Sequence, residues 1–574
     1  MRAAQRIAHS VHRACVVHQH VVSRGFSAGG TTAVVAAATG AEPLKWLGRA
    51  FVGLSFASSA SAVALHLTSP AVAEQQLSAP PLLTPPTLVE LVPRAAVLCC
   101  LFLPLLLVAP FAAFFPRLHA SLYDLLTTTL ARAGPAFIKW GQWAATRPDL
   151  FPPALCEALS QLHRQAPAHG WAHTRREVRA AFGGQSLDDV FIFFDPEPLG
   201  SGSIAQVHVA RLRCDPTRDV AVKVRHPNVE DRMRTDFELL GQLAALADHV
   251  PALAALRLRD TLAQFGHVMA AQVFLSREGG NLKVLGANLR SAPHIGVSVP
   301  TPLHPPGQRD ACDAVLVETY EPGQPLSIAI AKGNLTGEAR RHVVQSGKEA
   351  YLNMVLVDHF CHADMHAGNI LLETVPGRAP KLVLVDAGMV DRLSSAEAEA
   401  FASLFLAFGH ADGLAAADAL FACCKTHKAG DEPSLDSVPR ASTDANAREQ
   451  QRIALGQSMQ RVFDTHCRGF RTGADVGAAL RGTLGALREH AVRLDGKSAA
   501  TLVNLLCVQS FAHALDPDYC LLDASEGVLR AHAVLGTATL RLISAAVSPA
   551  VATARAVHEA FVWRLPHVLA NNAL

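Results

Sequence analysis

Two stretches decide the fold predicted for this chain: Val220-Ala221-Val222-Lys223 and His362-Ala363-Asp364-Met365-His366-Ala367-Gly368-Asn369. The first reads as a strand that ends in a lysine. The second places Asn369 five positions after Asp364, the interval that phosphoryl-transfer enzymes of the kinase type use between a catalytic Asp and a magnesium-binding Asn. Asp386-Ala387-Gly388 follows, so the polar groups of a nucleotide-phosphate site occur in kinase order.

A Gly/Ser-rich turn precedes the lysine strand. Gly200-Ser201-Gly202-Ser203 leads into an alternating apolar strand that contains Val207. Glycine at positions 200 and 202 lets backbone amides approach a phosphate, because no Cβ intervenes. A turn at Cys214-Asp215-Pro216 and a second strand through Ala221 complete a hairpin, typical of a kinase N-lobe in which the lysine reaches the α- and β-phosphates of ATP.

Lys223 needs a carboxylate partner if it is buried. Glu238 and Glu278 lie on the following predicted helices, and we favour Glu278. The stretch from Ala314 to Gly323 reads as a strand running into a turn, the expected place of an adenine-binding hinge. Glu318 and Tyr320 are therefore predicted to contact the nucleotide.

Residues 370–372 and 381–385 read as two short strands. They place Asn369 just before the first strand and Asp386 just after the second, so two oxygen ligands would meet where Mg²⁺ bridges nucleotide phosphates. Asp364 would orient the attacking hydroxyl or water as a base. The fold expected from these elements is α+β and two-lobed, protein-kinase-like, with an N-terminal helical extension and a helical C-terminal region.

The composition of the whole chain indicates its surroundings and its partners. Of 574 residues, 50% are hydrophobic and 17% charged, which indicates membrane contact. A net charge of +2 gives no basic field, so nucleic acid is not an expected partner. Twelve cysteines occur without a CxxC pair, which excludes a zinc ribbon and favours reduced thiols.

The N-terminal region carries two targeting signals. Residues 1–41 hold arginines and no acidic residue, which is typical of a mitochondrial transit peptide. Residues 95–116 are free of charge and long enough to cross a bilayer, with a hairpin of buried helices as the alternative. The predicted location is the mitochondrial inner membrane, with a single pass.

The chain is predicted to divide into eight parts: a transit peptide (1–41), a linker (42–94), a transmembrane helix (95–116), a helical extension (118–182), the N-lobe and hinge (183–323), the C-lobe core (324–427), a polar loop (428–450) and C-terminal helices (451–574). The apolar run at 531–553 contains Arg541 and is predicted to pack or lie at an interface, not to span.

With these motifs in place, the chain resembles the aarF/UbiB-type atypical kinases, which are linked to ubiquinone biosynthesis. Lys139-Trp140-Gly141-Gln142 is similar to the family's KxGQ motif, and His362 to Asn369 to its HxDxHxGN loop. The likeness extends over roughly residues 130–520, from the KxGQ motif to the C-terminal helices. It implies that Lys139, Gly141 and Gln142 lie on an extension that covers the cleft and obstructs a peptide substrate.

The chain departs from this family at several positions. Gly200-Ser201-Gly202-Ser203 replaces an Ala-rich loop, and Asp386-Ala387-Gly388 replaces Asp-Phe-Gly. Gln272 stands where many members have an acid, which affects the ion pairs expected around Lys139 and Lys223. Met365 and Ala367 replace prolines of the catalytic loop.

The resemblance implies a Mg²⁺-dependent ATPase or a small-molecule or lipid kinase that supports coenzyme Q biosynthesis or mitochondrial lipid metabolism. ATP is the expected ligand, and an isoprenoid or quinone-type lipid and coenzyme Q biosynthesis proteins are the expected partners. One alternative is a catalytically silent pseudokinase scaffold that binds nucleotide or isoprenoid lipid. Another is a metalloenzyme built on His359, His362, Asp364 and His366, which leaves Lys223 and Asn369 unexplained.

Overall fold

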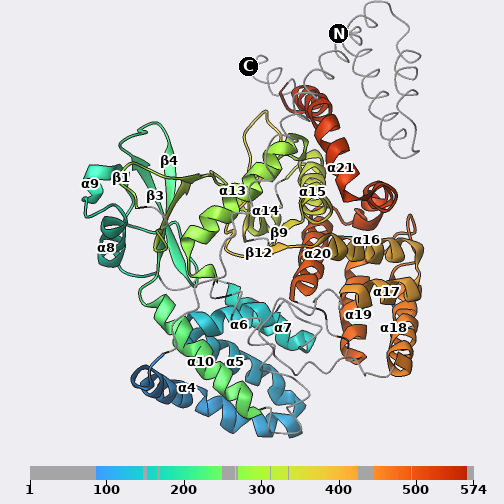
Figure 1. Cartoon of the computed structure of the whole chain (residues 1–574), viewed down its shortest axis with the longest axis horizontal. Helices are drawn as coiled ribbons and strands as arrows, with labels where there is room; N and C mark the ends of the chain where they lie inside the picture. Colours follow the sequence, from blue (N-terminus) through green and yellow to red (C-terminus); the bar gives the residue numbers. More distant parts are fainter. Residues whose placement is uncertain are drawn as a thin grey trace, which may run out of the picture.

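The computed structural model describes residues 86–145, 151–163, 168–247, 266, 269, 271–309, 312–333, 335–366, 368–423, 445–490, 492, 494 and 496–564. The predicted transit peptide, most of the predicted linker and most of the predicted polar loop lie outside these residues. Two lobes and a helical layer beneath them make up the described chain (Figure 1).

The N-lobe is built on a six-stranded sheet with the order β1-β3-β4-β7-β6, in which β2 pairs with β3. Its strands are antiparallel: β1 (Phe191–Phe194), β2 (Gly200–Ser201), β3 (Ala205–Leu212), β4 (Asp219–Arg225), β6 (Pro302–Leu303) and β7 (Val315–Thr319). The predicted hairpin is β3–β4, with Val207 opposite Lys223. Helices α8 (Trp171–Ala181), α9 (Leu187–Val190) and α13 (Leu275–Ser291) pack on this sheet, α13 against β7.

The C-lobe holds short strands and long helices around the largest core of the molecule. Its strands are β5 (Val297–Ser298), β8 (Gln324–Pro325), β9 (Phe360–His362), β10 (Ile370–Glu373), β11 (Lys381–Leu384) and β12 (Val390–Arg392). The predicted strand pair is the antiparallel pair β10–β11, and β9 pairs with β12. Helices α14 (Leu326–Lys332) and α15 (Gly337–Asn353) precede the catalytic loop, and a π-helical turn (Met354–Asp358) ends α15.

Helices complete the C-terminal region. They are α16 (Ser395–His410), α17 (Gly413–Cys423), α18 (Ala445–His466), α19 (Val476–Glu489), α20 (Gly496–Leu515) and α21 (Leu521–Glu559), followed by a π-helical turn (Ala560–Arg564). The predicted polar loop ended at residue 450, which was too late, because α18 begins at Ala445. Helix α20 contacts α15 and α19 within this region.

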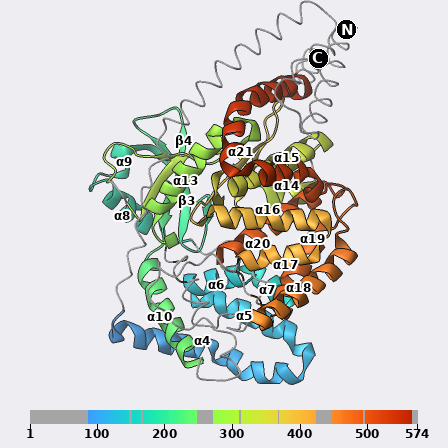
Figure 2. The same ribbon diagram turned by 45° about the vertical axis from the view of Figure 1, so that its right-hand side comes forward.

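The helical extension forms the layer beneath the lobes, around α4 (Leu88–Phe114), α5 (His119–Ala133), α6 (Pro135–Ala145), α7 (Pro153–Ser160) and α10 (Val229–Ala247) (Figures 1 and 2). The predicted linker ended too late, since α4 begins at Leu88, where the Thr87 amide donates to Glu90. Arg94 does not end the apolar helix, because its guanidinium pairs with buried Asp236 of α10 at 2.7 Å.

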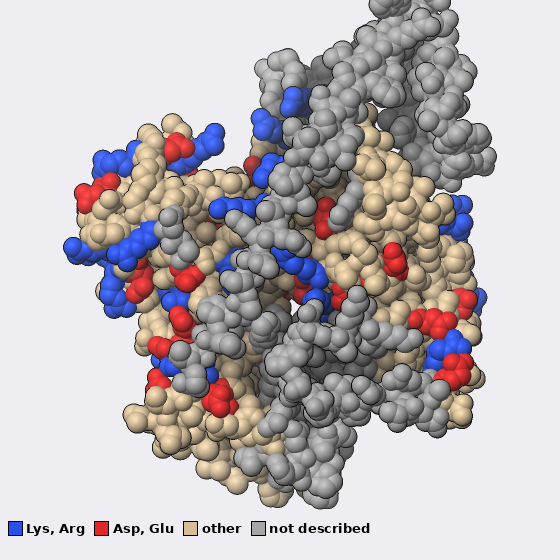
Figure 3. All heavy atoms as spheres, in the orientation of Figure 1, with Lys and Arg blue, Asp and Glu red and all other residues tan. Residues whose placement is uncertain are grey.

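Two described helices are long and apolar enough to cross a membrane by length and composition. Residues Leu88–Ala109 have a mean hydropathy of 2.4 and only 11% of that window is buried, whereas Lys497–Leu515 in α20 is 67% buried. The second is therefore a core helix of the C-lobe. The first keeps an exposed apolar face that includes Leu103, Leu106, Leu107 and Phe111, and the surface around α4 and α5 is nearly free of charge in Figure 3.

Candidate functional site

Lys223 lies at the centre of a buried charge cluster between the N-lobe sheet and α13. Its Nζ is 2.5 Å from Glu278 Oε1 and 3.2 Å from Glu318 Oε1. Strand β4 presents the lysine, the first turn of α13 presents Glu278, and β7 presents Glu318. The structure therefore brings together Lys223 and the preferred partner Glu278, and adds a second carboxylate that spacing did not predict.

Carboxylates outnumber ammonium groups in this cluster. Burial alone would lower the pKa of Lys223, but the nearby charges of Glu278, Glu318 and Asp386 raise it, so the lysine is protonated. Burial raises the pKa of Glu278 to about 7, with Lys223 opposing the shift. Burial also raises the pKa of Glu318, whose Oε2 has no hydrogen-bond partner among the described atoms. The cluster is thus poised to accept a further cation or hydrogen-bond donor.

The catalytic loop is held by hydrogen bonds to its own side chains and to α20. The amide Nδ2 of Asn369 donates to the backbone oxygen of Asp364 at 3.1 Å and to its Oδ2 at 3.3 Å. His362 Nδ1 accepts from the Asp364 amide at 3.2 Å. Asn504 accepts from the Met365 amide and donates to the His362 carbonyl, both at 3.1 Å. Asp364 and Asn369 are therefore oriented as one unit.

Hydrogen bonds hold the Asp-Ala-Gly turn against the catalytic loop. The Val385 amide donates to the Asn369 carbonyl at 2.9 Å, and His362 Nε2 contacts the Val385 carbonyl at 3.2 Å. Asn281 of α13 donates to the Ala387 carbonyl at 2.8 Å. Asp386 has a φ of 61°, a conformation that non-glycine residues rarely adopt and that these contacts must maintain. Its side chain is exposed, and its carboxylate accepts from the Gly388 amide at 3.4 Å.

Mg²⁺ suits the donors gathered here. The side-chain NH₂ group of Asn369 donates to Asp364, so the side-chain oxygen of Asn369 is directed away from Asp364. Asp386 offers a carboxylate. Oxygen donors of this kind are those that Mg²⁺ prefers. In contrast, no group of three or more His, Cys, Asp or Glu residues within the described chain is arranged to hold a metal ion, which leaves the transition-metal alternative without support.

The predicted nucleotide loop is a tight turn between β2 and β3. Gly200 pairs with Val207, and the Gly202 amide donates to the Ala205 carbonyl at 2.9 Å. A Cβ on Gly200 would meet no atom within 4 Å, so the space above the loop is open. Ala221 is buried opposite Glu318 at the back of this half of the site. Tyr320 lies just past the end of β7, where its amide contacts the Asp219 carbonyl at 3.4 Å.

Helix α6 carries the KxGQ-like motif and touches both lobes. Its Phe137 shares a core with Ile204 of the nucleotide loop and with Met389 after the Asp-Ala-Gly turn. Gln142 donates to the Leu162 carbonyl at 2.8 Å, so this side chain faces the neighbouring turn. Lys139 is half-buried and has no ion pair among the described residues, and Gln272 contacts Met269 instead. The departure at Gln272 thus leaves Lys139 without the expected carboxylate.

Residues 161–419 match the ABC1 atypical kinase-like domain family. This chain carries an ABC1/UbiB atypical kinase domain. The match includes the nucleotide loop, Lys223, Glu278, the catalytic loop and Asp386. The predicted two-lobed kinase-like fold is confirmed.

Relatives of this ABC1 domain come from eukaryotes and bacteria. The probable serine/threonine-protein kinase abkC of Dictyostelium discoideum is 28% identical over 76% of this chain and 68% of its own length. The mitochondrial ABC1 family protein C21C3.03 of Schizosaccharomyces pombe is 28% identical over 76% and 70%. The probable protein kinase UbiB of Xylella fastidiosa M23 is 33% identical over 52% of this chain and 54% of the relative.

Sequence reasoning missed three residues of the site: Asn281, Asn504 and Glu318 in its role beside Lys223. Asn281 lies three positions after Glu278 on one helix face, a spacing that could have indicated a shared site. Nothing in the sequence marks Asn504, because it lies 135 or more positions from the loop it holds.

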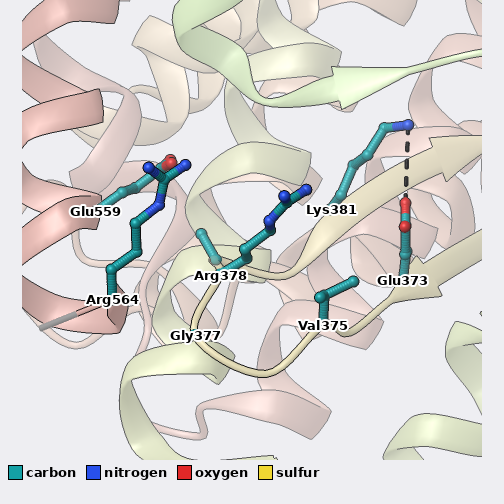
Figure 4. A pocket seen from close by; sticks show the side chains of 8 residues that line it. Glu373, Val375, Gly377, Arg378, Lys381, Glu559 and Arg564 are labelled. Carbon is teal, nitrogen blue, oxygen red and sulfur yellow. Dashed lines mark ion pairs between the residues drawn. The ribbon is translucent and has the colours of Figure 1, made fainter. Parts of the chain in front are cut away.

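A separate cavity of about 200 Å³ lies on the C-lobe and contains none of the predicted site residues (Figure 4). It is lined by the β10–β11 turn and the end of the C-terminal helix, including Arg378, Lys381, Glu559 and Arg564. Lys381 is already paired with Glu373 at 3.8 Å and Glu321 at 3.0 Å. The mixed charges of this cavity do not favour one class of ligand.

Proposed function

We propose that this chain binds ATP with Mg²⁺ and uses it, as an ATPase or a small-molecule or lipid kinase, to support coenzyme Q production at the mitochondrial inner membrane. The observation that carries the proposal is the Lys223–Glu278 pair, with Nζ and Oε1 at 2.5 Å, facing a loop in which Asn369 holds Asp364. A paired lysine of this kind is a requirement for kinase-type phosphoryl transfer.

Each residue has one role in this proposal. Lys223 binds the nucleotide phosphates, and the nucleotide loop at 200–203 covers them. Asn369 and Asp386 hold Mg²⁺, which neutralises phosphate charge when it is bound. Asp364 accepts the proton of the attacking hydroxyl or water. Glu318 and Tyr320 lie where the adenine would enter, beside Val207 and Ala221.

Two features support a substrate that is not a peptide. Helix α6 belongs to the same apolar cluster as Ile204 and Met389, which supports the proposal that it covers the approach to the cleft. The exposed apolar face of α4 shares this core through Phe102, whose ring centroid is 5.5 Å from that of Phe137. A site connected in this way to an apolar helix suits a lipid-embedded acceptor, such as an isoprenoid or quinone precursor. The name of the fission-yeast relative supports the mitochondrial assignment, and the resemblance to UbiB-type kinases supports the coenzyme Q assignment.

The test is Mg²⁺-dependent ATP hydrolysis by purified protein, with and without lipid vesicles. Wild type is compared with Lys223→Arg, Asp364→Asn and Asp386→Asn, and with Lys283→Arg as a control, since Lys283 is exposed on the same helix as Glu278. We expect turnover to fall at least about 100-fold in the three site variants and to stay unchanged in the control. Equal activity in all four would disprove the assigned roles.

The second candidate function is a pseudokinase scaffold that binds nucleotide without turnover. The surplus of carboxylates around Lys223 and the loss of the aromatic residue at Ala387 favour it. Nucleotide binding measured by fluorescence, combined with no hydrolysis in the presence of Mg²⁺ and lipid, would support this function over the first.

A further inference from the structure

Four histidines gather behind the nucleotide loop, and the proposed function does not use them. His169 precedes α8, His173 lies on it, His208 lies on β3, and His226 follows β4. The Nδ1 atoms of His169 and His226 are 2.6 Å apart, and His226 Nε2 is 2.9 Å from the Gly202 carbonyl. We call His169, Thr174, Gln206, His208 and His226 the histidine clasp.

Backbone groups of fixed polarity determine several of the protons in the histidine clasp. The Gly202 carbonyl can only accept, so His226 carries a proton on Nε2, and when His226 is neutral its Nδ1 accepts from His169 Nδ1. His169 Nε2 must then accept from the Thr174 hydroxyl at 3.0 Å.

The same reasoning fixes the other side of the clasp. The Asp195 carbonyl accepts from His208 Nδ1 at 2.8 Å, so His208 Nε2 is an acceptor. The His169 amide donates to Gln206 Oε1 at 2.8 Å, which turns the Gln206 NH₂ group toward His208 Nε2 at 2.9 Å. The hydrogen bonds therefore form one consistent set in which His169, His208 and His226 are all neutral.

We propose that the histidine clasp positions the nucleotide loop by donating from His226 Nε2 to the Gly202 carbonyl, and that it loosens as His169 and His226 become protonated. The inference rests on the proposed function in that the loop is taken to cover a nucleotide. The ring centroid of His169 lies 4.6 Å from that of His173 and 4.8 Å from that of His226, so positive charges on these rings repel one another. One proton can be accommodated when His169 donates from Nε2 to the Thr174 hydroxyl, but with both rings charged two N–H donors would face each other at 2.6 Å. His226 is then a positioning residue that acts through Gly202.

The surroundings of the clasp keep it neutral. Burial and the neighbouring histidines lower the pKa of His169 to about 3, and burial lowers the pKa of His226 and of His208. The ring of His173 meets that of His169 edge-on, with ring centroids 4.6 Å apart. The charged groups around the clasp within the described chain are Asp195 and Glu197 near His208, Arg176 and Glu177 near His173, and Arg225 with its partner Glu230.

The sign of the pH effect follows from these shifts. Lowered histidine pKa values mean that the unfolded or released loop binds protons more readily than the clasped loop. The stabilisation from the clasp is therefore fully present above about pH 6.5 and is lost as the pH falls from 6.5 toward the pKa of the clasped state. Loop closure should weaken in acid.

The test measures binding of a fluorescent ATP analogue with Mg²⁺ to the full chain between pH 5.5 and 8. His226→Ala should weaken binding roughly fivefold at pH 7.5, the equivalent of one lost hydrogen bond. His226→Gln keeps a donor at the Nε2 position, so it should bind within about twofold of wild type but lose the weakening below pH 6.5. The comparison with His226→Gln also cancels titration of the nucleotide's own phosphate. His410→Ala, an exposed histidine on α16, is the control.

A second readout does not depend on nucleotide. The protection factor of the Gly202 amide, whose N–H donates to Ala205, should fall in His226→Ala and in wild type at pH 5.5, but not in His410→Ala at pH 7.5. Unchanged binding, pH profile and Gly202 exchange in both His226 variants would overturn the clasp. If wild type binds no nucleotide, the proposed function fails while the exchange experiment still decides the clasp. If His226→Ala does not fold, His226→Gln decides alone.

Discussion

Lys223 Nζ lies 2.5 Å from Glu278 Oε1, and this single contact joins strand β4 to helix α13 across 55 positions of sequence. Both side chains are buried, and Glu318 approaches the same ammonium at 3.2 Å. The contact fixes where a nucleotide phosphate would meet the lysine. Negative charge is concentrated around this contact, because the charge of Asp386 also acts on Glu278.

The two carboxylates beside Lys223 should respond differently to substitution. Glu278→Ala removes the shorter contact and should destabilise the fold by about 3 kcal/mol, since the buried Lys223 ammonium loses its closest partner. Glu318→Gln should cost less than about 1 kcal/mol, because it relieves repulsion and Glu318 Oε2 has no partner to lose within the described structure. Chemical denaturation at pH 7.5 measures both, and a larger loss in Glu318→Gln would contradict this ranking.

The same cluster predicts a pH dependence of stability. The pKa of Glu278 is raised from 4.5 to about 7 in the folded protein, so the folded state binds a proton that the unfolded state releases. Its contribution to stability is fully present below about pH 4.5 and is lost as the pH rises through about 7. Urea unfolding of wild type and Glu278→Gln between pH 5 and 8 measures the contribution, which should vanish in the variant. An identical pH slope in the two proteins would refute it.

Asn504 should matter far more than its distance in sequence from the catalytic loop suggests. Asn504→Ala leaves the Met365 amide and the His362 carbonyl without their partner, and two buried unsatisfied groups cost about 2–4 kcal/mol. ATP turnover should also fall, because Asp364 follows directly on this segment. Ser510→Ala, an exposed position on the same helix, should change the unfolding free energy by less than about 0.5 kcal/mol. A similar loss in both variants would argue against the loop-holding role.

Position 141 should accept a residue larger than glycine only if Leu162 is replaced by a smaller residue. A Cβ at position 141 would overlap Leu162 and come within 3.3 Å of Leu130, both of which are buried. Gly141→Ala should therefore destabilise the protein by about 1–3 kcal/mol, and the double variant with Leu162→Ala should relieve the overlap, so that the two costs are not additive. Gly170→Ala meets no atom within 4 Å and serves as the control. Full additivity in the double variant would show that α6 shifts freely.

Arg94 should anchor the apolar helix α4 to the kinase domain. Its Nε and Nη2 contact the two oxygens of Asp236 at 2.7 and 2.9 Å, and the Asp236 side chain is fully buried. Arg94→Ala leaves that carboxylate unpaired, which should cost about 3–5 kcal/mol and raise protease cleavage between α4 and α5. Arg94→Ala combined with Asp236→Asn should recover part of the loss. Unaltered cleavage kinetics in Arg94→Ala would contradict the anchoring role.

The sequence alone determined the local elements and the order of the site residues. Alternating apolar residues gave the β3–β4 hairpin and the β10–β11 pair, because strand periodicity is a local property. Kinase spacing then predicted Lys223, Asp364, Asn369 and Asp386 as site residues. The structure confirms the choice of Glu278 over Glu238 as the partner of Lys223. The start of α4 was missed, since the charge of Arg94 is compensated by Asp236, 142 positions away.

Only the tertiary structure decided how these parts support one another. Glu318 turns toward Lys223, Asn504 holds the catalytic loop from α20, and His226 binds the Gly202 carbonyl through a tautomer set by distant groups. Each of these contacts joins residues far apart in the chain, and no periodicity or spacing rule encodes such pairs. Packing brings them together, and burial then gives their charges and hydrogen bonds the strength that the exposed side chains would lack.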